Sequence, residues 1–383
     1  MATARFRNAA GVMLAVLSTA SCGASYGSAP SGGVAVAERR SASAPQTCRP
    51  VFYTPQGAAM PKKIVAQGPG LVLGGGGTDV DAEFVWIHDT IVGSHTARGG
   101  DLVVLRASGN NDYDRYIYQL APYHSVRTLR LPTCTPPNVL AAAARIVNRS
   151  SAVFFAGGNQ ADYVIWKGTP VQTAVQGVYA RGGVIGGTSA GEAILGNYVF
   201  DAVAEGERDT TTDNAVHNPY EKLISFTYDF LKFPPLDGAI TDQHFVTRNH
   251  FGRTAVFMAR QIADGKVTRR PAVVLGVAVD EASGIAIDKH GIGTLLLQGS
   301  GGSAFLIRGG PAKQIVAKQP FVSATLRVTK LGTQGERFDF KTWCGKEPTY
   351  DVTVNGAEPD RLMYSPRNPY KPPPGSRIPK CSG

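Results

Sequence analysis

The sequence predicts an α/β fold: a mostly parallel sheet sandwiched by helices, followed by a small β-rich extension. Between residues 62 and 284, short and nearly continuous apolar runs alternate with amphipathic runs, the pattern of buried parallel strands joined by helices. After about residue 283 the apolar runs alternate and are separated by turns, which is typical of antiparallel strands. The chain has 383 residues, 43% of them hydrophobic, enough to build a large core.

The expected elements begin with the segment IVAQGPGLVLGGGG, one or two strands that end in a run of glycines. A helix follows over 78–92, with Thr78 or Asp79 as its N-cap. Pro stands early in the helix expected over 136–150, where it is tolerated. The other expected elements are strands at 101–108, 126–131, 152–160, 183–189, 238–245 and 272–281, and helices at 169–182 and 248–265.

The N-terminal residues predict export. Arg5 and Arg7 precede a short apolar stretch and then small residues that end at Cys22, as in a secretory signal. Cleavage before Cys22 would leave a lipid-anchored protein on the cell envelope, whereas ordinary signal cleavage would leave a periplasmic or secreted one. The expected segments are the signal at 1–22, a flexible linker and lead-in at 23–61, the α/β domain at 62–284 and the β-rich extension at 285–383.

Five cysteines, Cys22, Cys48, Cys134, Cys344 and Cys381, fit an exported chain. If Cys22 carries lipid, four remain for disulfide bonds in an oxidising compartment, with three pairings open. Proximity in the tail favours Cys344–Cys381, which leaves Cys48–Cys134. The sequence has no Cys-x-x-Cys pair and no metal-type His/Cys spacing, so we expect neither a metal nor another cofactor.

The net charge of +10 indicates a solvated basic surface. Lysine and arginine are scattered rather than clustered, and no aromatic residues alternate with them in a basic run. This pattern argues against nucleic-acid binding.

The segment GGVIGGTSAGEAIL places Ser189 between an expected strand and an expected helix. Such an elbow exposes one side chain above the sheet and directs the first N–H groups of the helix at the atom it attacks. Gly187 and Gly191 leave room for the tight turn. We therefore predict a serine nucleophile, with Ala190 N–H and an N–H of the 157–159 turn as oxyanion donors.

A serine nucleophile needs a base, and the base needs an orienting acid. Of seven histidines, only His244 directly follows an expected strand of the sheet. Asp242 would share a face with it on an extended segment, as the acid or as a substrate-binding group. Glu281 closes an apolar strand, where a solvated strand end is the simpler interpretation. The residues alone leave the acid open.

Four segments together resemble the cyanophycinase and aspartyl dipeptidase family of serine peptidases: FFAGGNQADYVIW, TPVQTAVQGVYARGGVIGGTSAGEAIL, TDQHFVTRNHFGR and VLGVAVDEASG. The resemblance covers roughly Lys62 to Gly284 and rests on the order and spacing of all four. It implies an α/β sandwich similar to class I glutamine amidotransferases, a serine in place of cysteine, no cofactor, and a homodimer. Cyanophycinases cut a β-linked aspartyl-arginine polymer into dipeptides, and their relatives remove N-terminal aspartyl residues.

Position by position, the resemblance implies that Ser189 is the nucleophile, His244 the base and Glu281 the orienting acid. It also implies that Gly158 and Ala190 are the oxyanion donors. The residues that match substrate-holding positions of cyanophycinases are Gln160, Asp242, Gln243, Arg248 and Arg253. Carboxylates and amides suit an arginine-bearing chain, and arginine forks suit its carboxylates.

Three hypotheses remain open. The leading one is an exported serine exopeptidase that hydrolyses cyanophycin to β-aspartyl-arginine dipeptides. The second is an α-aspartyl dipeptidase or a related hydrolase of small acidic peptides, motivated by His250, which stands where the family carries a further arginine. The third is a non-catalytic binding protein on the same fold, against which the intact Ser189, His244 and Glu281 argue.

Overall fold

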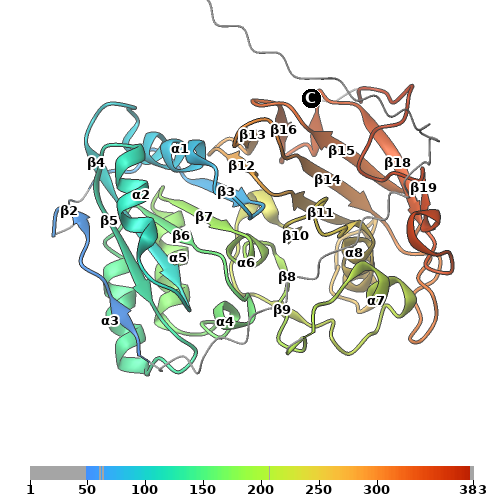
Figure 1. Ribbon diagram of the computed structural model, residues 1–383, viewed down its shortest axis with the longest axis horizontal. Helices are drawn as coiled ribbons and strands as arrows, with labels where there is room; N and C mark the ends of the chain where they lie inside the picture. The colour runs from blue at the N-terminus through green and yellow to red at the C-terminus, as the bar shows by residue number, and fades with distance from the viewer. Residues whose placement is uncertain (1–48, 60–61, 63, 207, 380–383) are drawn as a thin grey trace, which may run out of the picture. The chain divides into compact units, whose positions relative to one another are not determined.

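Two mixed sheets organise the part of the chain that the computed structural model describes, residues 49–59, 62, 64–206 and 208–379 (Figure 1). Within these residues the first sheet has eleven strands in the order β1-β5-β4-β6-β7-β3-β12-β13-β16-β17, with β2 beside β5. Its centre, β5-β4-β6-β7-β3, is parallel, as the continuous apolar runs predict. The strands are β1 (Val51–Phe52), β2 (Gln56–Gly57), β3 (Gly70–Gly74), β4 (Gly99–Arg106), β5 (Tyr123–Arg130), β6 (Ala152–Phe155), β7 (Val184–Thr188), β12 (Ser283–Ile287), β13 (Ile292–Leu297), β16 (Arg337–Asp339) and β17 (Cys344–Gly345).

The second sheet has eight strands in the described residues, in the order β19-β18-β15-β14-β11-β10-β8-β9. Only β8, β10 and β11 run parallel, and the rest of the sheet is antiparallel. The α/β class is as predicted, but the sequence patterns did not predict that the strands divide into two mixed sheets. The strands are β8 (Tyr198–Phe200), β9 (Phe226–Tyr228), β10 (Ala239–Asp242), β11 (Val274–Val279), β14 (Ala304–Gly309), β15 (Leu326–Leu331), β18 (Thr349–Val354) and β19 (Tyr364–Ser365).

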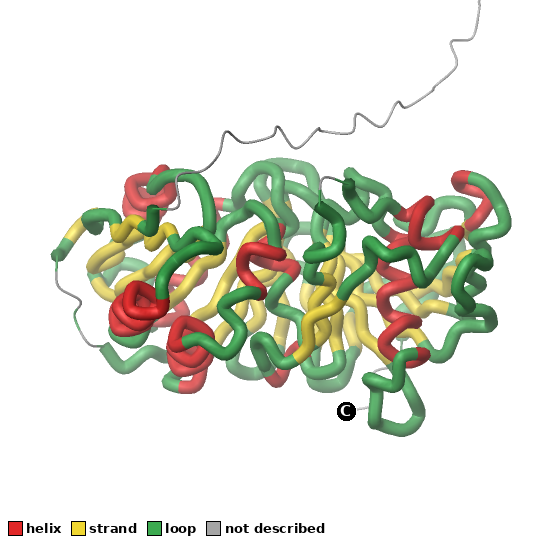
Figure 2. The backbone as a smooth tube through the Cα atoms, turned by 90° about the horizontal axis from the view of Figure 1, so that it is seen from below, coloured by secondary structure: helices red, strands yellow, loops and turns green. Residues whose placement is uncertain are grey.

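Helices cover the sheets through three apolar cores, and Figure 2 shows helices on both sides of the strands. One core packs α1 and α2 on the first sheet, a second packs α3 and α5 on its other face, and the third packs α7 and α8 on the second sheet. The α-helices are α1 (Asp81–Val92), α2 (Asp112–Leu120), α3 (Pro137–Val147), α4 (Ala161–Val164), α5 (Pro170–Ala180), α6 (Ala190–Ala193), α7 (Thr212–His217) and α8 (Phe251–Ala263), and the 3₁₀ turns are η1 (Pro234–Leu236) and η2 (Asp360–Met363). Both faces of the first sheet are thus buried, which is why its central strands are apolar throughout.

The predicted boundary between residues 284 and 285 falls inside strand β12 and does not separate two domains. β12 pairs with β3 of the first sheet, with Gly284 opposite Gly74. β14 pairs with β11 of the second sheet along its whole length. The β-rich character of the C-terminal region is as predicted, but its strands complete both sheets. Alternating patterns identify strands and do not specify their partners, which lie far away in sequence.

The expected strands and helices of the α/β region are present at or near their expected positions, and several short elements, among them α4, α7, β8 and β9, were not expected. Helix α1 begins after Val80, which caps it without a side-chain hydrogen bond, in place of Thr78 or Asp79. Helix α2 was not predicted. In the described residues, no helix is both long and apolar enough to cross a membrane. The expected signal and linker up to Cys48 lie outside the described residues.

Two of the five cysteines lie in the described part of the chain. Cys134 and Cys344 are each disulfide-bonded. Cys48 and Cys381, their expected partners, lie outside the described residues, so the pairing stays a prediction.

Candidate active site

Ser189 occupies a strained turn between a strand and a helix. Strand β7 ends at Thr188 and helix α6 begins at Ala190, so Ser189 is the helix N-cap, with φ 52° and ψ −120°. A non-glycine residue rarely holds this conformation, and such strain concentrates at functional sites. A Cβ on Gly191 would lie 2.1 Å from the Phe155 carbonyl oxygen. Glycine at that position therefore lets the turn pack against β6.

His244 and Glu281 reach Ser189 from the second sheet. Ser189 Oγ lies 2.7 Å from His244 Nε2, and His244 Nδ1 lies 2.6 Å from Glu281 Oε1. His244 follows β10 and Glu281 follows β11, so both side chains stand at the carboxyl ends of parallel strands. The structure thus brings together the three residues that the family resemblance marks as nucleophile, base and acid, in the geometry of a catalytic triad.

The glycine run after β3 ties the three turns of the triad together. Its successive carbonyls of Gly74, Gly75 and Gly76 accept hydrogen bonds from Ser189 N (2.9 Å), His244 N (2.9 Å) and Ala282 N (3.1 Å). Side chains on this run would fill the space that the triad occupies. Sequence analysis treated the run only as a turn. The signal in the sequence for these contacts was the four consecutive glycines, because glycine allows backbones to approach closely.

Asp280 fixes the turn that follows His244. Its Oδ1 accepts hydrogen bonds from Val246 N (3.0 Å), Thr247 N (2.9 Å) and Thr247 Oγ1 (3.0 Å). The carboxylate beside the triad acid therefore helps to hold the base-bearing loop in place.

Burial keeps the imidazole of His244 neutral. Loss of water around the ring, together with the Arg248 cation, lowers the pKa of His244 to about 3. A buried histidine loses hydration of its charged form, and nearby cations disfavour that form further. The Asp242 carboxylate opposes the shift. The Glu281 carboxylate lies at Nδ1, where it can stabilise the imidazolium once a proton arrives from Ser189.

The turn after β6 lies beside the nucleophile, as an oxyanion donor requires. A Cβ on Gly157 would stand 3.6 Å from the Ser189 Cβ. Gly158 has φ 148° and is exposed, while Ala190 opens α6. Two backbone segments thus flank Ser189, and the oxyanion role of Gly158 and Ala190 stays a prediction.

Asp242 and Arg253, expected to hold substrate, bind each other. Arg253 Nε donates to Asp242 Oδ2 at 3.1 Å and Arg253 Nη2 to Oδ1 at 2.5 Å. The Asp242 carboxylate also accepts a hydrogen bond from Thr254 Oγ1, and Arg253 Nη1 donates to the Thr210 carbonyl. The two residues are only 2% and 5% exposed. Their charged groups face inward, so the geometry does not favour direct substrate contact, and we interpret the pair as support for the loop of His244.

The other expected substrate residues differ in access. Arg248 is exposed on the loop after His244, whereas Gln160 and Gln243 are buried. His250, which replaces a family arginine, is buried too, with Nδ1 2.7 Å from the Gln243 carbonyl oxygen. It therefore shapes the backbone of the loop from inside. Substrate contact by Gln160, Gln243 and Arg248 stays a prediction.

Two buried glutamates near the site escaped sequence analysis. Glu192 is completely buried on α6, and neither of its carboxyl oxygens has a hydrogen-bond partner in the described residues. Glu83 on α1 is also buried and lies against Gly74 and Gly284. Burial raises the pKa of both carboxyls well above the usual range of a glutamate. An amphipathic pattern gives no signal that a glutamate faces inward.

The described residues contain no evident set of metal-ligating side chains. Among residues 49–59, 62, 64–206 and 208–379, no group of three His, Cys, Asp or Glu side chains could hold a metal ion.

The fold and the site together have the arrangement of an α/β serine hydrolase. The chain is similar to the cyanophycinase of Geminocystis herdmanii (strain PCC 6308), with 26% identity over 204 residues. This match covers 51% of the chain and spans 65% of the length of that cyanophycinase. It confirms the resemblance to the cyanophycinase family that the four segments carry.

Two solved structures are also similar. A peptidase from an acI-B1 Actinobacterium has 15% identity and a TM-score of 0.42, with 72% of this chain and 98% of that one covered. A putative peptidase E from Listeria monocytogenes EGD-e has 14% identity and a TM-score of 0.36, with 60% and 98% covered. No family model matches the chain.

Proposed function

We propose that the chain is an exported serine exopeptidase that hydrolyses cyanophycin to β-aspartyl-arginine dipeptides. The observation that carries the proposal is the continuous hydrogen-bonded line from Ser189 Oγ to His244 (2.7 Å) and on to Glu281 (2.6 Å). A serine, a neutral histidine and a carboxylate in this order activate a hydroxyl for attack on an acyl carbon. The similarity to a cyanophycinase supports a peptide of β-linked aspartate and arginine as the substrate.

In the proposed reaction, His244 Nε2 takes the proton of Ser189 as Oγ attacks the scissile carbonyl carbon. The resulting oxyanion accepts hydrogen bonds from the N–H groups of Ala190 and Gly158. His244 then gives the proton to the leaving amine as the C–N bond breaks. A water molecule, deprotonated by the same imidazole, attacks the acyl carbon, and the imidazolium returns that proton to Ser189 Oγ as the ester bond breaks and the acid is released. Glu281 stabilises the imidazolium in both steps.

The structure weakens the motive for a dipeptide substrate. That alternative came from His250, but His250 is buried and hydrogen-bonded to the backbone of its own loop. The residue therefore does not lie on the surface that a polymer would meet. Arg248 is exposed beside the triad, and its guanidinium suits the carboxylates of an aspartyl-arginine chain.

Export, lipid attachment at Cys22 and a homodimer are parts of the proposal that rest on the sequence and the family resemblance. Labelling with a radioactive fatty acid in a bacterial host would test the lipid directly, with Cys22→Ser as the control. A secreted protein without label would support ordinary signal cleavage.

The decisive experiment incubates the purified mature protein with insoluble cyanophycin and identifies soluble products by mass. We expect β-aspartyl-arginine from the wild type and from Ser300→Ala, an exposed serine control, and none from Ser189→Ala. Release by Ser189→Ala would refute the assigned nucleophile. If wild-type protein that reacts with a fluorophosphonate probe leaves the polymer intact and cleaves α-aspartyl dipeptides, the second hypothesis replaces the first. If no probe reacts with the folded protein, the binding-protein hypothesis replaces both.

A further inference from the structure

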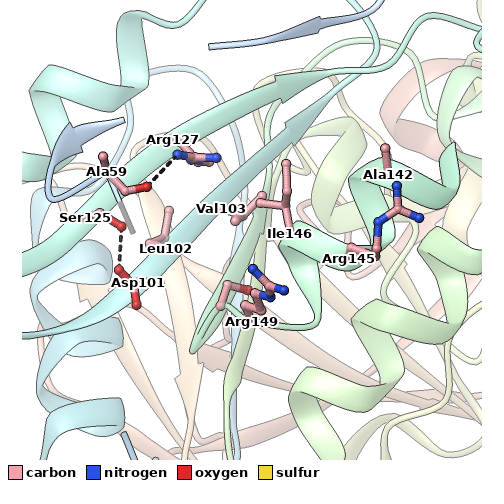
Figure 3. A pocket seen from close by; sticks show the side chains of 11 residues that line it. Ala59, Asp101, Leu102, Val103, Ser125, Arg127, Ala142, Arg145, Ile146 and Arg149 are labelled. Atoms are coloured by element: carbon pink, nitrogen blue, oxygen red, sulfur yellow. Dashed lines mark hydrogen bonds between the residues drawn. The ribbon is translucent and has the colours of Figure 1, made fainter. Parts of the chain in front are cut away.

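A pocket of about 250 Å³ lies between helix α3 and the strands β4 and β5 (Figure 3). Asp101 and Leu102 stand near the start of β4, and Ser150 precedes β6. The pocket therefore opens near the amino-terminal ends of the parallel strands. The triad stands beyond their carboxyl ends, so the two sites lie at opposite edges of the sheet architecture.

Three arginines surround the pocket. Arg127 comes from β5, Arg145 from α3 and Arg149 from the turn after α3, and Figure 3 shows their side chains around the same space. In the described part of the chain none of the three is in an ion pair; Arg127 makes a long hydrogen bond, 3.4 Å, to the Ala59 carbonyl. Guanidinium groups gathered without carboxylate partners raise the local positive potential and favour an anion.

The carboxylate in the pocket wall is already engaged elsewhere. Asp101 Oδ1 accepts a hydrogen bond from Ser125 Oγ (2.5 Å) and lies 2.8 Å from His124 Nδ1. Its Oδ2 accepts one from Lys62 N (2.9 Å). These contacts join β4, β5 and the segment before β3. Both carboxylate oxygens of Asp101 are thus engaged by other groups, and Asp101 has no ion pair with the three arginines among the described residues.

Apolar side chains form the floor between the guanidinium groups. Val103 is buried on β4 on the face that α3 covers, and Ile146 and Ala142 line the same pocket from α3. A bare inorganic ion would leave this apolar surface exposed to water. A ligand that joins an anionic head to an apolar body would cover it and reach the arginines at the same time.

We propose that this pocket binds a small organic anion, a carboxylate or phosphate ester on a compact apolar group. Arginine forks accept either head in a bidentate manner. The volume is slightly below the roughly 300–1,000 Å³ of pockets that enclose drug-sized ligands, so the ligand is smaller than these. The site is separate from the triad, and the proposal is independent of the substrate.

Titration calorimetry on the full mature protein at low salt tests the proposal with phenyl phosphate, phenylacetate and inorganic phosphate as probes. We expect at least one organic anion to bind, at least about tenfold more tightly than inorganic phosphate because of the apolar floor. Arg145→Gln combined with Arg149→Gln should weaken binding by about tenfold or more, since it removes two charge-assisted contacts. Both residues are exposed, so the variant should fold, which its melting temperature checks.

Arg115→Gln, an exposed arginine on α2, is the matched control and should bind as the wild type does. Fluorophosphonate labelling of Ser189 should not change in any variant. Which of the two organic probes binds identifies the anionic head. Failure of both to bind at millimolar concentration overturns the proposal, as does equal affinity in the double arginine variant. Loss of binding after Ser189 is labelled would place the anion in the active site and overturn it too.

Discussion

Replacing Gly76 with alanine should push a methyl group into the catalytic triad. A Cβ at this position would lie 2.4 Å from His244 Cε1, 2.7 Å from His244 Nε2 and 3.0 Å from Ser189 Cβ. Ordinary contacts begin at 3.4 Å, so the imidazole must retreat by about 1 Å. The hydrogen bond between Ser189 and His244 cannot survive such a shift unchanged.

The expected loss follows from that displacement. A misplacement of about 1 Å in a catalytic group costs on the order of 10²-fold in rate. Gly76 also has φ +93°, and alanine in a left-handed conformation adds roughly 1–2 kcal/mol of strain. Strain alone would lower the melting temperature and would leave the chemistry of the folded fraction intact.

Gly265→Ala separates the two effects. Gly265 has φ +69°, and nothing lies within 4 Å of a Cβ placed there, so this variant carries strain without a clash. We expect both variants to melt below the wild type, and only Gly76→Ala to react about 10²-fold more slowly with a fluorophosphonate probe. Equal labelling rates for the two variants would refute the geometry assigned to the glycine run.

Three further predictions concern charge. Burial and Arg248 lower the pKa of His244 to about 3, so labelling should hold from about pH 8 to about pH 5, and an inflection near 6.5 would contradict this. The unfolded chain takes up that proton first as the pH falls below 6.5, so the same shift lowers the free energy of unfolding there. Glu192 has a raised pKa; the stability it contributes below pH 4.5 is lost as the pH rises. Glu192→Gln should therefore melt higher than wild type at about pH 8 and alike at about pH 4, and equal melting temperatures at both would refute the burial argument. Arg253→Ala leaves the buried Asp242 carboxylate without its guanidinium partner, which should cost about 3–5 kcal/mol in urea unfolding; a loss below about 1 kcal/mol would indicate a solvated pair.

The elbow at Ser189 could be predicted from sequence because its determinants are local. An apolar strand, two glycines and a helix start occupy consecutive positions, and the turn that they predict is the turn observed. His244 could be proposed for a related reason, since it follows an apolar strand, whereas the same position after a strand favoured a solvated interpretation of Glu281. The sequence left open which acid serves the histidine. Either the family resemblance or the distance of 2.6 Å from His244 to Glu281 was needed to decide it.

Features that depend on distant partners could not be predicted. Asp242 and Arg253 are charged residues eleven positions apart, and nothing in their sequence context shows that they bury each other's charge. The second sheet could not be predicted for the same reason, because the pairing of β14 with β11 is decided by packing rather than by composition. Glu192 is a third example, a carboxyl inside a core where solvent exposure is the rule.

Because β12 pairs with β3, the first sheet can be completed only late in synthesis of the chain. A ribosome that has released residues up to Ala282 has produced Ser189, His244 and Glu281, yet one side of β3 and one side of β11 would still be bare. Bare strand edges recruit other chains. Gly284 must return to Gly74, 210 positions earlier, and contacts across such separations form slowly. The nascent chain therefore carries Ser189, His244 and Glu281 before the strands that cover the free edges of β3 and β11 have been made.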